Sequence, residues 1–373
     1  MMEKRDKKPD YALEGDGNQK EVPAPELPYL PVEPTKYRPN IGLIGCGGIT
    51  EYHLRSYKSA GYRVVALCNR TEERARARQK EFYPRAEVYT DHRDLLARDD
   101  IDVVDIATHP PERVAIIEDA ITAGKHILSQ KPFVTDLDVG ERLVDLADRH
   151  EVKLAVNQNG RWAPHFSYMR HAVDTGLVGA VFSFHTSTHW NHDWIAETPF
   201  NAVPHMIFFD FGVHWFDMLA CLFADREPES VFATLAHSPA QRASEPLLGQ
   251  AVIRFSDALA SLTFDGAVRV GQQDRSFVAG TRGTLASIGP GITQQNVTVS
   301  TEEGISHPEL EGSWFEQGFH GTMAELLCAI EAEREPLHGA RGNLKSLALS
   351  FAAIASARRG ESVRPGSVRR LPE

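Results

Sequence analysis

The stretch IGLIGCGGITEYHLRSYKSAG, residues 41–61, decides the fold. It begins with a short apolar run that ends in glycine, continues through two more glycines and then becomes a helical pattern. A glycine directly after a strand permits a tight turn, and a second one lets backbone amides approach a pyrophosphate, while the following helix offers its positive N-terminus. With a strand before it and a helix after it, this loop is predicted to bind a dinucleotide.

The same rhythm continues to about residue 160. Further apolar runs expected to be strands cover 63–69, 100–108, 126–130 and 153–159, and helical patterns between them cover 71–82, 111–125 and 138–151. Strands that alternate with helices predict right-handed βαβ units and a doubly wound parallel sheet of the Rossmann type.

A different pattern follows Arg161. Long β-rich runs cover 180–190, 251–266, 275–289 and 295–304. Consecutive strands joined by short turns predict a large, open, mainly antiparallel sheet with one covered face. Amphipathic helices are expected at 319–335 and 342–360, the second with a glycine stop. The fold class is therefore α/β, with a Rossmann domain followed by an α+β domain.

We divide the chain into three parts. Residues 1–38 form a proline-rich arm, 39–160 the dinucleotide-binding domain, and 161–373 a substrate-binding domain whose C-terminal helix packs back toward the first domain. The composition of the arm predicts flexibility. Packing of the arm against the body or against a neighbouring subunit remains the alternative.

Bulk composition excludes several classes of protein. The net charge of −11 argues against a nucleic-acid binder, and no run of about 18 apolar residues predicts a membrane span. The N-terminal residues carry charges but no apolar core of an export signal. The four cysteines are far apart in apolar segments, which is typical of reduced, buried thiols. We therefore expect a cytoplasmic location.

The end of the second strand bears on the choice of nucleotide. NAD-binding proteins usually carry an acidic residue there, which bonds the ribose 2′-hydroxyl, but this chain has Asn69. Arg70 and Arg74 follow and could bind a 2′-phosphate, which favours NADP over NAD. The alternative is that both arginines lie on a solvated helix face and that Glu72 reaches the ribose.

Further residues of the nucleotide site come from the glycine loop and from the ends of later strands. The residues expected to contact the nucleotide are Gly45, Gly47, Gly48, Ile49, Thr50, Asn69, Arg70, Arg74, Thr108, Pro110, Gln130 and Lys131. Thr50 occupies the position of the third glycine or alanine of the dinucleotide fingerprint.

A second informative stretch is MIFFDFGVHWFDML, residues 206–219, a helix that is apolar almost all round. Asp210, His214 and Asp217 fall within about 60° of one another on it. One interpretation is a polar wall that faces a cleft, and another is a purely structural stripe. A zinc site is a third, with one more ligand taken from His185, His189 or His192. The close ligand spacing of known metal sites is lacking, so we predict no metal.

Four segments in order resemble the glucose–fructose oxidoreductase/inositol dehydrogenase (Gfo/Idh/MocA) family. They are GCGGITEYH (45–53), AGKHILSQKPF (123–133), DFGVHWFD (210–217) and AGTRGTL (279–285). The resemblance runs from about Asn40 to the C-terminus. It implies a catalytic set of Lys131, Asp210 and His214, in which His214 takes the hydroxyl proton while hydride leaves for nicotinamide C4. Lys131 would polarise the oxygen, Asp210 would orient a hydroxyl or the imidazole, and Asp217 would be structural.

Two departures from the family pattern stand out. Gln130 replaces the glutamate that normally precedes the lysine, which removes a negative charge beside Lys131. The usual glycine-rich approach to the Asp–His helix is replaced by FNAVPHMIFF (200–209), which is expected to put His205 near the rim of the pocket.

The segment HTSTHWNHDWIAETPFN, residues 185–201, is a candidate substrate wall. Its tryptophans could stack on the apolar face of a sugar, while His189, His192 and Asp193 bond its hydroxyls. The alternative is that the tryptophans are core and the histidines line a solvated strand end. The residues expected to contact substrate are Lys131, Arg161, Trp190, His192, Trp194, His205, Asp210 and His214.

The predicted function is an NAD(P)-dependent oxidoreductase that acts on a sugar, polyol or related cyclic alcohol. Three alternatives remain: a redox-assisted glycosidase without net cofactor turnover, a non-catalytic nucleotide-binding sensor or scaffold, and a structural metalloprotein. A homodimer or homotetramer is expected from the resemblance and from the open sheet, whose second face needs cover.

Overall fold

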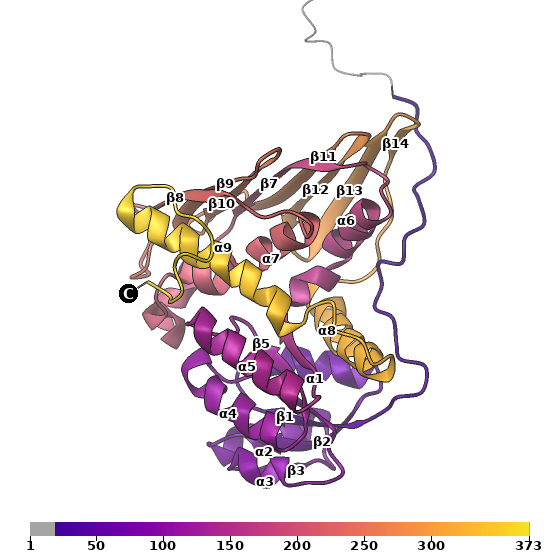
Figure 1. Cartoon of the computed structure of the whole chain (residues 1–373), viewed down its shortest axis with the longest axis vertical. Helices are drawn as coiled ribbons and strands as arrows, with labels where there is room; N and C mark the ends of the chain where they lie inside the picture. The colour runs from indigo at the N-terminus through magenta and orange to yellow at the C-terminus, as the bar shows by residue number, and fades with distance from the viewer. Residues whose placement is uncertain (1–18, 373) are drawn as a thin grey trace, which may run out of the picture.

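The protein is described by a computed structural model of residues 19–372. Two sheets dominate it, one at each end of the molecule, with helices around the first and helices against one face of the second (Figure 1). The predicted fold class is confirmed: a parallel sheet of the Rossmann type is followed by a mainly antiparallel open sheet.

The first sheet has the strand order β3-β2-β1-β4-β5-β6, and all of its pairs are parallel. Its strands are β1 (Asn40–Ile44), β2 (Arg63–Cys68), β3 (Glu87–Tyr89), β4 (Val103–Ile106), β5 (His126–Gln130) and β6 (Leu154–Asn157). The helices between them are α1 (Thr50–Ser59), α2 (Glu72–Phe82), α3 (His92–Leu96), α4 (Pro110–Thr122) and α5 (Leu137–Arg149). The sequence pattern does not predict β3 and α3, because elements this short carry almost no periodic signal.

The second sheet has the order β14-β13-β12-β11-β7-β10-β9-β8. Its strands are β7 (Val181–His189), β8 (Ser230–Ala236), β9 (Leu248–Arg254), β10 (Leu259–Asp265), β11 (Gln273–Gly280), β12 (Gly283–Gly291), β13 (Gln294–Thr301) and β14 (Gly304–Ser306). Neighbours are antiparallel except β7 and β10, which pair in parallel. The helices of this half are α6 (Pro164–Asp174), α7 (Val213–Leu222), α8 (Trp314–Glu331) and α9 (Ala340–Arg359).

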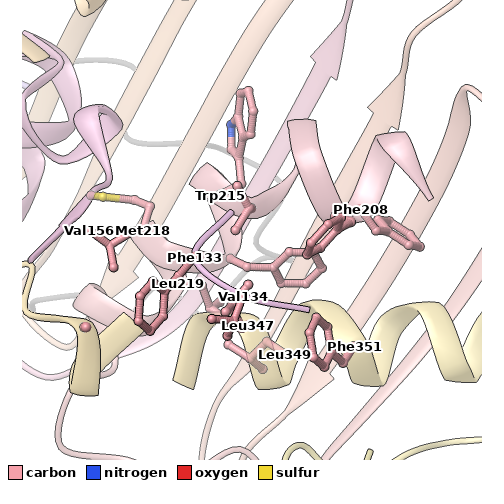
Figure 2. Close-up of a cluster of buried hydrophobic side chains, with 14 of the residues drawn as sticks. Phe133, Val134, Val156, Phe208, Trp215, Met218, Leu219, Leu347, Leu349 and Phe351 are labelled. Atoms are coloured by element: carbon pink, nitrogen blue, oxygen red, sulfur yellow. The ribbon is translucent and has the colours of Figure 1, made fainter. Parts of the chain in front are cut away.

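A shared core joins the two halves. Figure 2 shows Phe133 and Val134, from the loop after β5, beside Leu219 of α7 and Leu347 of α9. These side chains are almost completely buried. α9 contacts α5 on one side and α7 and β8 on the other. Its end at Gly360 has a left-handed backbone (φ +68°), as the glycine stop predicts.

Residues 19–38 of the arm lie along the body and run from the region of β14 toward the first sheet (Figure 1). The backbone amide of Val22 donates to the carbonyl of Ile305, and the hydroxyl of Tyr168 donates to the carbonyl of Pro25. The carboxylate of Glu331 accepts three backbone amides at residues 35–37. The flexible interpretation therefore does not describe residues 19–38, because this segment finds hydrogen-bond partners on the body. Residues 1–18 lie outside the described part.

The helix expected over 206–219 is interrupted. A π-helical turn covers Ile207–Phe211, and α7 begins only at Val213. A π turn inserts one extra residue per turn, so it rotates the side chains before it relative to those after it. Asp210 is thereby offset from α7, the helix that carries both His214 and Asp217. Within residues 19–372, none of the helices is long and apolar enough to cross a membrane.

Candidate active site

The glycine loop lies between β1 and α1. Gly45 has φ +97°, and a Cβ there would lie 2.9 Å from the backbone of Ala107, so only glycine fits. No atom lies within 4 Å of a Cβ built on Gly47 or Gly48, which leaves their backbone open to a ligand. The hydroxyl of Thr50 donates to the Gly47 carbonyl at 2.6 Å and steadies the turn. This loop fits a pyrophosphate.

Asn69, which follows the last residue of β2, stabilises the glycine loop through its side chain. Its Oδ1 accepts the amide of Cys46 at 3.0 Å, and its Nδ2 donates to the carbonyl of Thr71 at 2.9 Å. Both ends of the amide are therefore engaged by the protein.

A hollow of about 430 Å³ adjoins the glycine loop and is bordered by Arg74 and Arg78 of α2. Arg70 does not line it and pairs instead with Glu112 at 2.6 Å. Arg78 was not among the residues expected from the sequence. The sequence does contain a signal for Arg78, because positions 74 and 78 are one helical turn apart and therefore share a face of α2.

A cavity of about 500 Å³ lies beyond the carboxyl ends of β4 and β5, where ligands bind in doubly wound sheets. The first half of the chain contributes Ile49, Ala107, Thr108, His109, Pro110, Arg113, Gln130, Lys131 and Pro132. Asn159, at the end of the first domain, also lines it, and the second domain contributes Trp190, His192, Trp194, Ile195, Phe200, Met206, Asp210, Phe211, His214, Trp215, Ile292, Trp314, Phe315 and Phe319. The cavity thus brings Lys131, Asp210 and His214 together.

Lys131 and Asp210 join the two halves of this cavity. The ammonium of Lys131 donates to the backbone carbonyl of Asp210 at 2.9 Å and to its carboxylate at 3.3 Å. Both side chains remain about one-fifth exposed, so a ligand in the cavity can reach them. The peptide bond between Lys131 and Pro132 is cis.

His214 lies on the wall of the cavity, against the ring of Trp314. Burial, reinforced by the ammonium of Lys131, holds the pKa of His214 well below its ordinary value. Within the described residues, no hydrogen-bond partner reaches its buried Nδ1. The imidazole is therefore neutral near pH 7 and can accept a proton.

The tryptophans and His192 also line the cavity. Trp190 packs edge-on against Phe211, with ring centres 5.0 Å apart, and its indole N–H has no partner within residues 19–372. Trp194 is 52% exposed. Burial lowers the pKa of His192 to about 4, so this ring is also neutral.

Arg161 and His205 are corrections to the expected substrate set. Arg161 is buried away from the cavity and pairs bidentately with Asp217 at 2.6 and 2.8 Å, because a buried carboxylate needs a compensating charge. His205 turns to the C-terminal segment, where its Nε2 donates to the carbonyl of Pro372 at 2.6 Å. Asp217 also accepts from Ser346 and occupies the structural position that the resemblance implied.

The other polar residues of the 185–201 segment do not reach the cavity. His185 points to the outer face of the sheet, where it bonds Ser183 and Ser261. His189 lies 3.9 Å from Asp265. Asp193 accepts the backbone amides of residues 242 and 243. His185 and His189 therefore lie apart from Asp210 and His214, whereas His192, the third candidate zinc ligand, lines the same cavity. Among residues 19–372, no group of three or more His, Cys, Asp or Glu side chains is placed to hold a metal ion.

A buried network lies behind Lys131. Its backbone amide donates to Gln130 Oε1 at 2.7 Å, which leaves the Gln130 Nε2 to donate to His53 Nε2 at 3.3 Å. His53 Nδ1 then donates to Asp105 at 2.7 Å, and Tyr57 donates to the same oxygen. Gln130 therefore fits a neutral His53, with its proton on Nδ1.

Arg113 is the other group that sequence reasoning missed. It is buried, and its guanidinium donates to the carbonyls of Thr108, Gln130 and Pro132. Burial lowers the pKa of Arg113 to about 9. The side chain ties the ends of β4 and β5 together beneath the cavity. No motif marks it, because its partners are backbone atoms.

Comparisons with known proteins agree with this geometry. Residues 39–158 match the family described as "Oxidoreductase family, NAD-binding Rossmann fold" (GFO_IDH_MocA), and residues 166–286 match the "GFO/IDH/MocA C-terminal domain". The chain is 27% identical to a D-apiose dehydrogenase of Paraburkholderia graminis over 348 residues, which cover 86% of this chain and 88% of that protein.

Two other relatives are similar along most of their length. An inositol 2-dehydrogenase of Rhizobium meliloti is 27% identical over 330 residues, which cover 84% of this chain and 96% of the relative. The crystal structure of an oxidoreductase from Agrobacterium radiobacter, in complex with NAD+, L-tartaric acid and magnesium, superposes with a TM-score of 0.80 at 20% identity. That likeness covers 89% of this chain and 99% of the other, and it shows the shared fold.

The resemblance found in the sequence is thus confirmed over both halves of the chain. The protein belongs to the GFO/IDH/MocA family of oxidoreductases with an NAD-binding Rossmann fold.

Proposed function

We propose that this protein transfers hydride between nicotinamide C4 and an alcohol carbon of a sugar, polyol or related cyclic alcohol. The observation that carries the proposal is the convergence of Lys131, Asp210 and His214 in one cavity, which residues beside the nucleotide loop also line. The relatives named above are dehydrogenases of D-apiose and of inositol, which are both polyhydroxylated.

The three side chains have separate roles in this proposal. His214 is neutral because burial lowers its pKa, and it takes the proton of the substrate hydroxyl as the general base. Lys131 donates a hydrogen bond to the substrate oxygen and stabilises the charge that develops on it. Asp210 orients Lys131 through the 3.3 Å contact and can accept a neighbouring substrate hydroxyl. The nicotinamide supplies the hydride acceptor or donor.

The residues present fit a dinucleotide, and we propose NADP as the preferred form. The pyrophosphate would lie on the Gly45–Thr50 loop, and the nicotinamide beside Thr108 and Pro110. Support for NADP comes from the hollow beside the loop, where Arg74 and Arg78 can meet a 2′-phosphate bidentately. Glu72, the acidic candidate for the ribose, pairs with Arg76.

We propose a homo-oligomer that forms through the outer face of the second sheet. One cross-strand row on that face contains Phe232, Val252 and Phe277 from three different strands, and each of the three is more than 40% exposed. Ser261 and His185 lie between Val252 and Phe277, so the row mixes polar and apolar side chains. Exposed apolar side chains gathered on one sheet face are typical of an interaction surface.

The experiment that tests the function is a screen of free sugars, inositols and glycosides with NAD and NADP separately, read by the absorbance of reduced nicotinamide. Reduction with at least one alcohol is expected. Tight nucleotide binding without reduction by any of them would favour a sensor. Cleavage of a glycoside with an unchanged nucleotide spectrum would favour the redox-assisted glycosidase.

A further inference from the structure

The mouth of the cavity is aromatic. Trp194 and Phe200 line the cavity, yet they are 52% and 38% exposed, so they lie where it opens to solvent. They come from two short 3-10 turns, Asp193–Glu197 and Pro199–Ala202, and their rings meet edge-on with centres 6.2 Å apart. Phe315, in the first turn of α8, lines the cavity as well and is half-buried. Exposed aromatic faces around an opening are typical of a surface that a ligand covers.

The deeper wall continues this apolar character. Trp190, Phe211 and Ile292 line the cavity from three separate segments of the second half. The polar groups beside this wall are Asn159, from the end of the first domain, and His192, Asp210, His214 and the indole N–H groups of the tryptophans from the second. Asn159 already accepts from the indole of Trp314, and Asp210 already faces Lys131. His192 lies against Trp194, with ring centres 5.5 Å apart, so the hydrogen-bonding groups adjoin the aromatic mouth.

This distribution disfavours a substrate with a hydroxyl on every ring carbon. Each hydroxyl can donate one hydrogen bond and accept two. A hydroxyl placed against the ring faces of Trp194 or Phe200 would give up part of its hydration and find no acceptor there, which is unfavourable. A flat apolar group in the same place would instead cover the exposed rings, and aromatic pairs gain further from edge-on or offset contacts.

We propose that the substrate is an aryl glycoside, a sugar joined to an aromatic aglycone, and this rests on the proposed function. The sugar lies beside the polar groups, with the reacting hydroxyl between Lys131 and His214 and its neighbours near Asp210 and His192. The aglycone lies between Trp194, Phe200 and Phe315. Hydride leaves a ring carbon for the nucleotide, the hydroxyl proton passes to His214, and the product is a keto-glycoside whose glycosidic bond is intact.

The test compares phenyl β-glycosides, methyl β-glycosides and the free sugars of glucose, galactose and xylose, with reduced nucleotide as the readout. For the sugar that reacts best, kcat/KM is expected to be at least about tenfold higher for the phenyl than for the methyl glycoside. Trp194→Ala and Phe200→Ala should each lower this ratio at least about threefold. Phe232→Ala, an exposed phenylalanine outside the cavity, should leave the ratio unchanged.

Binding gives a second readout that does not depend on turnover. Calorimetric titration of the nucleotide complex of Lys131→Met should show tighter binding of the phenyl than of the methyl glycoside. Turnover of free sugars at least as fast as of phenyl glycosides would overturn the inference and leave the proposed function standing. A phenyl preference that survives Trp194→Ala and Phe200→Ala would also overturn it. Absence of hydride transfer with every compound of the wider screen would overturn the proposed function itself.

Discussion

The ammonium of Lys131 lies 2.9 Å from the backbone carbonyl of Asp210 and 3.3 Å from its carboxylate. Lys131 follows the last residue of β5, whereas Asp210 belongs to the π turn before α7. The contact therefore links the nucleotide half of the cavity to the substrate half. Because the π turn positions Asp210 independently of α7, the carboxylate can face the lysine while Asp217 pairs with Arg161 on the buried side.

Asp210→Asn should lower kcat/KM about 10- to 100-fold. The amide keeps the shape of the side chain but removes the negative charge that faces the Lys131 ammonium, so the lysine is held less firmly. Nucleotide affinity, measured by fluorescence titration, should stay within about twofold, because Asp210 lies in the substrate half of the cavity. The exposed Asp225→Asn is the matched control. Full activity of Asp210→Asn would contradict the proposal that the charge of Asp210 holds Lys131 in place.

The pH dependence of kcat/KM should show that His214 is harder to protonate than an ordinary histidine. Burial lowers the pKa of His214, so the neutral base persists as the pH falls through the ordinary histidine range near 6.5. The acid limb of kcat/KM is therefore expected well below pH 6.5. His214→Gln should lose about 10²- to 10⁴-fold in kcat, the range typical of a lost general base.

His150→Gln, an exposed histidine on the surface of the first domain, is the control and should keep the wild-type profile. An acid limb at pH 6.5 or above in the wild-type enzyme would contradict the assignment of His214 as a base with a lowered pKa.

Arg74→Ala and Arg78→Ala should each weaken NADP binding about tenfold and leave NAD binding nearly unchanged. Only NADP carries a 2′-phosphate, which under the proposed preference these guanidinium groups would meet in the hollow beside the glycine loop. Arg76→Ala removes a charge from the same helix at a position outside that hollow, and it should affect the two nucleotides equally. Equal losses for NAD and NADP in the first two variants would argue against a 2′-phosphate site.

The buried carboxyl of Asp274 should make the stability of the protein depend on pH. This carboxyl is buried on β11 beside Thr188, and burial raises its pKa to about 7. In the unfolded chain it ionises near 3.9. The folded state therefore binds the extra proton between these values, and the stability that Asp274 contributes falls as the pH rises from about 4 to 7. For one titrating group, the free energy of unfolding changes by at most about 1.4 kcal/mol per pH unit.

Asp274→Asn removes this dependence. The Tm of the variant minus that of the wild type should rise across the same window and level off above pH 7. Asp99→Asn, at an exposed position, should give a flat difference. A flat difference for Asp274→Asn would mean that the buried carboxyl does not titrate in this range.

Phe277→Asp should reduce the mass of the protein in solution, measured by light scattering at micromolar concentration. A charge among the exposed apolar side chains of the outer sheet face is costly to bury between two copies. Val270→Asp places the same charge at a side chain that is 90% exposed and lies outside the strands, so it should leave the mass unchanged. A wild-type monomer would contradict the proposed oligomer.

The strands and helices with a clear period could be predicted from the sequence. β1, α1 and the glycine loop follow from a local pattern, because hydrophobic alternation and glycine geometry act over a few residues. The same holds for the Lys131 position at a strand end and for the apolar helix that carries His214. The short β3 and α3 carry too few residues for a periodic signal.

The orientation of several polar side chains could not be predicted. Arg161 and His205 were expected at the substrate, but their partners, Asp217 and the carbonyl of Pro372, lie 56 and 167 residues away along the chain. Likewise, Arg113 bonds only backbone carbonyls, which no sequence motif specifies. Such partners are set by tertiary packing. The π turn also escaped prediction, because the apolar pattern around it fits a continuous α-helix equally well.

The most direct test of the central claim is hydride transfer by Lys131→Met and by Lys58→Met, a control at an exposed position of α1, each with its nucleotide affinity measured. The account predicts that Lys131→Met binds nucleotide within about threefold of wild type and loses at least about 10²-fold in kcat, whereas Lys58→Met matches wild type in both. Wild-type kcat in Lys131→Met would contradict the assignment of this cavity as the site of hydride transfer.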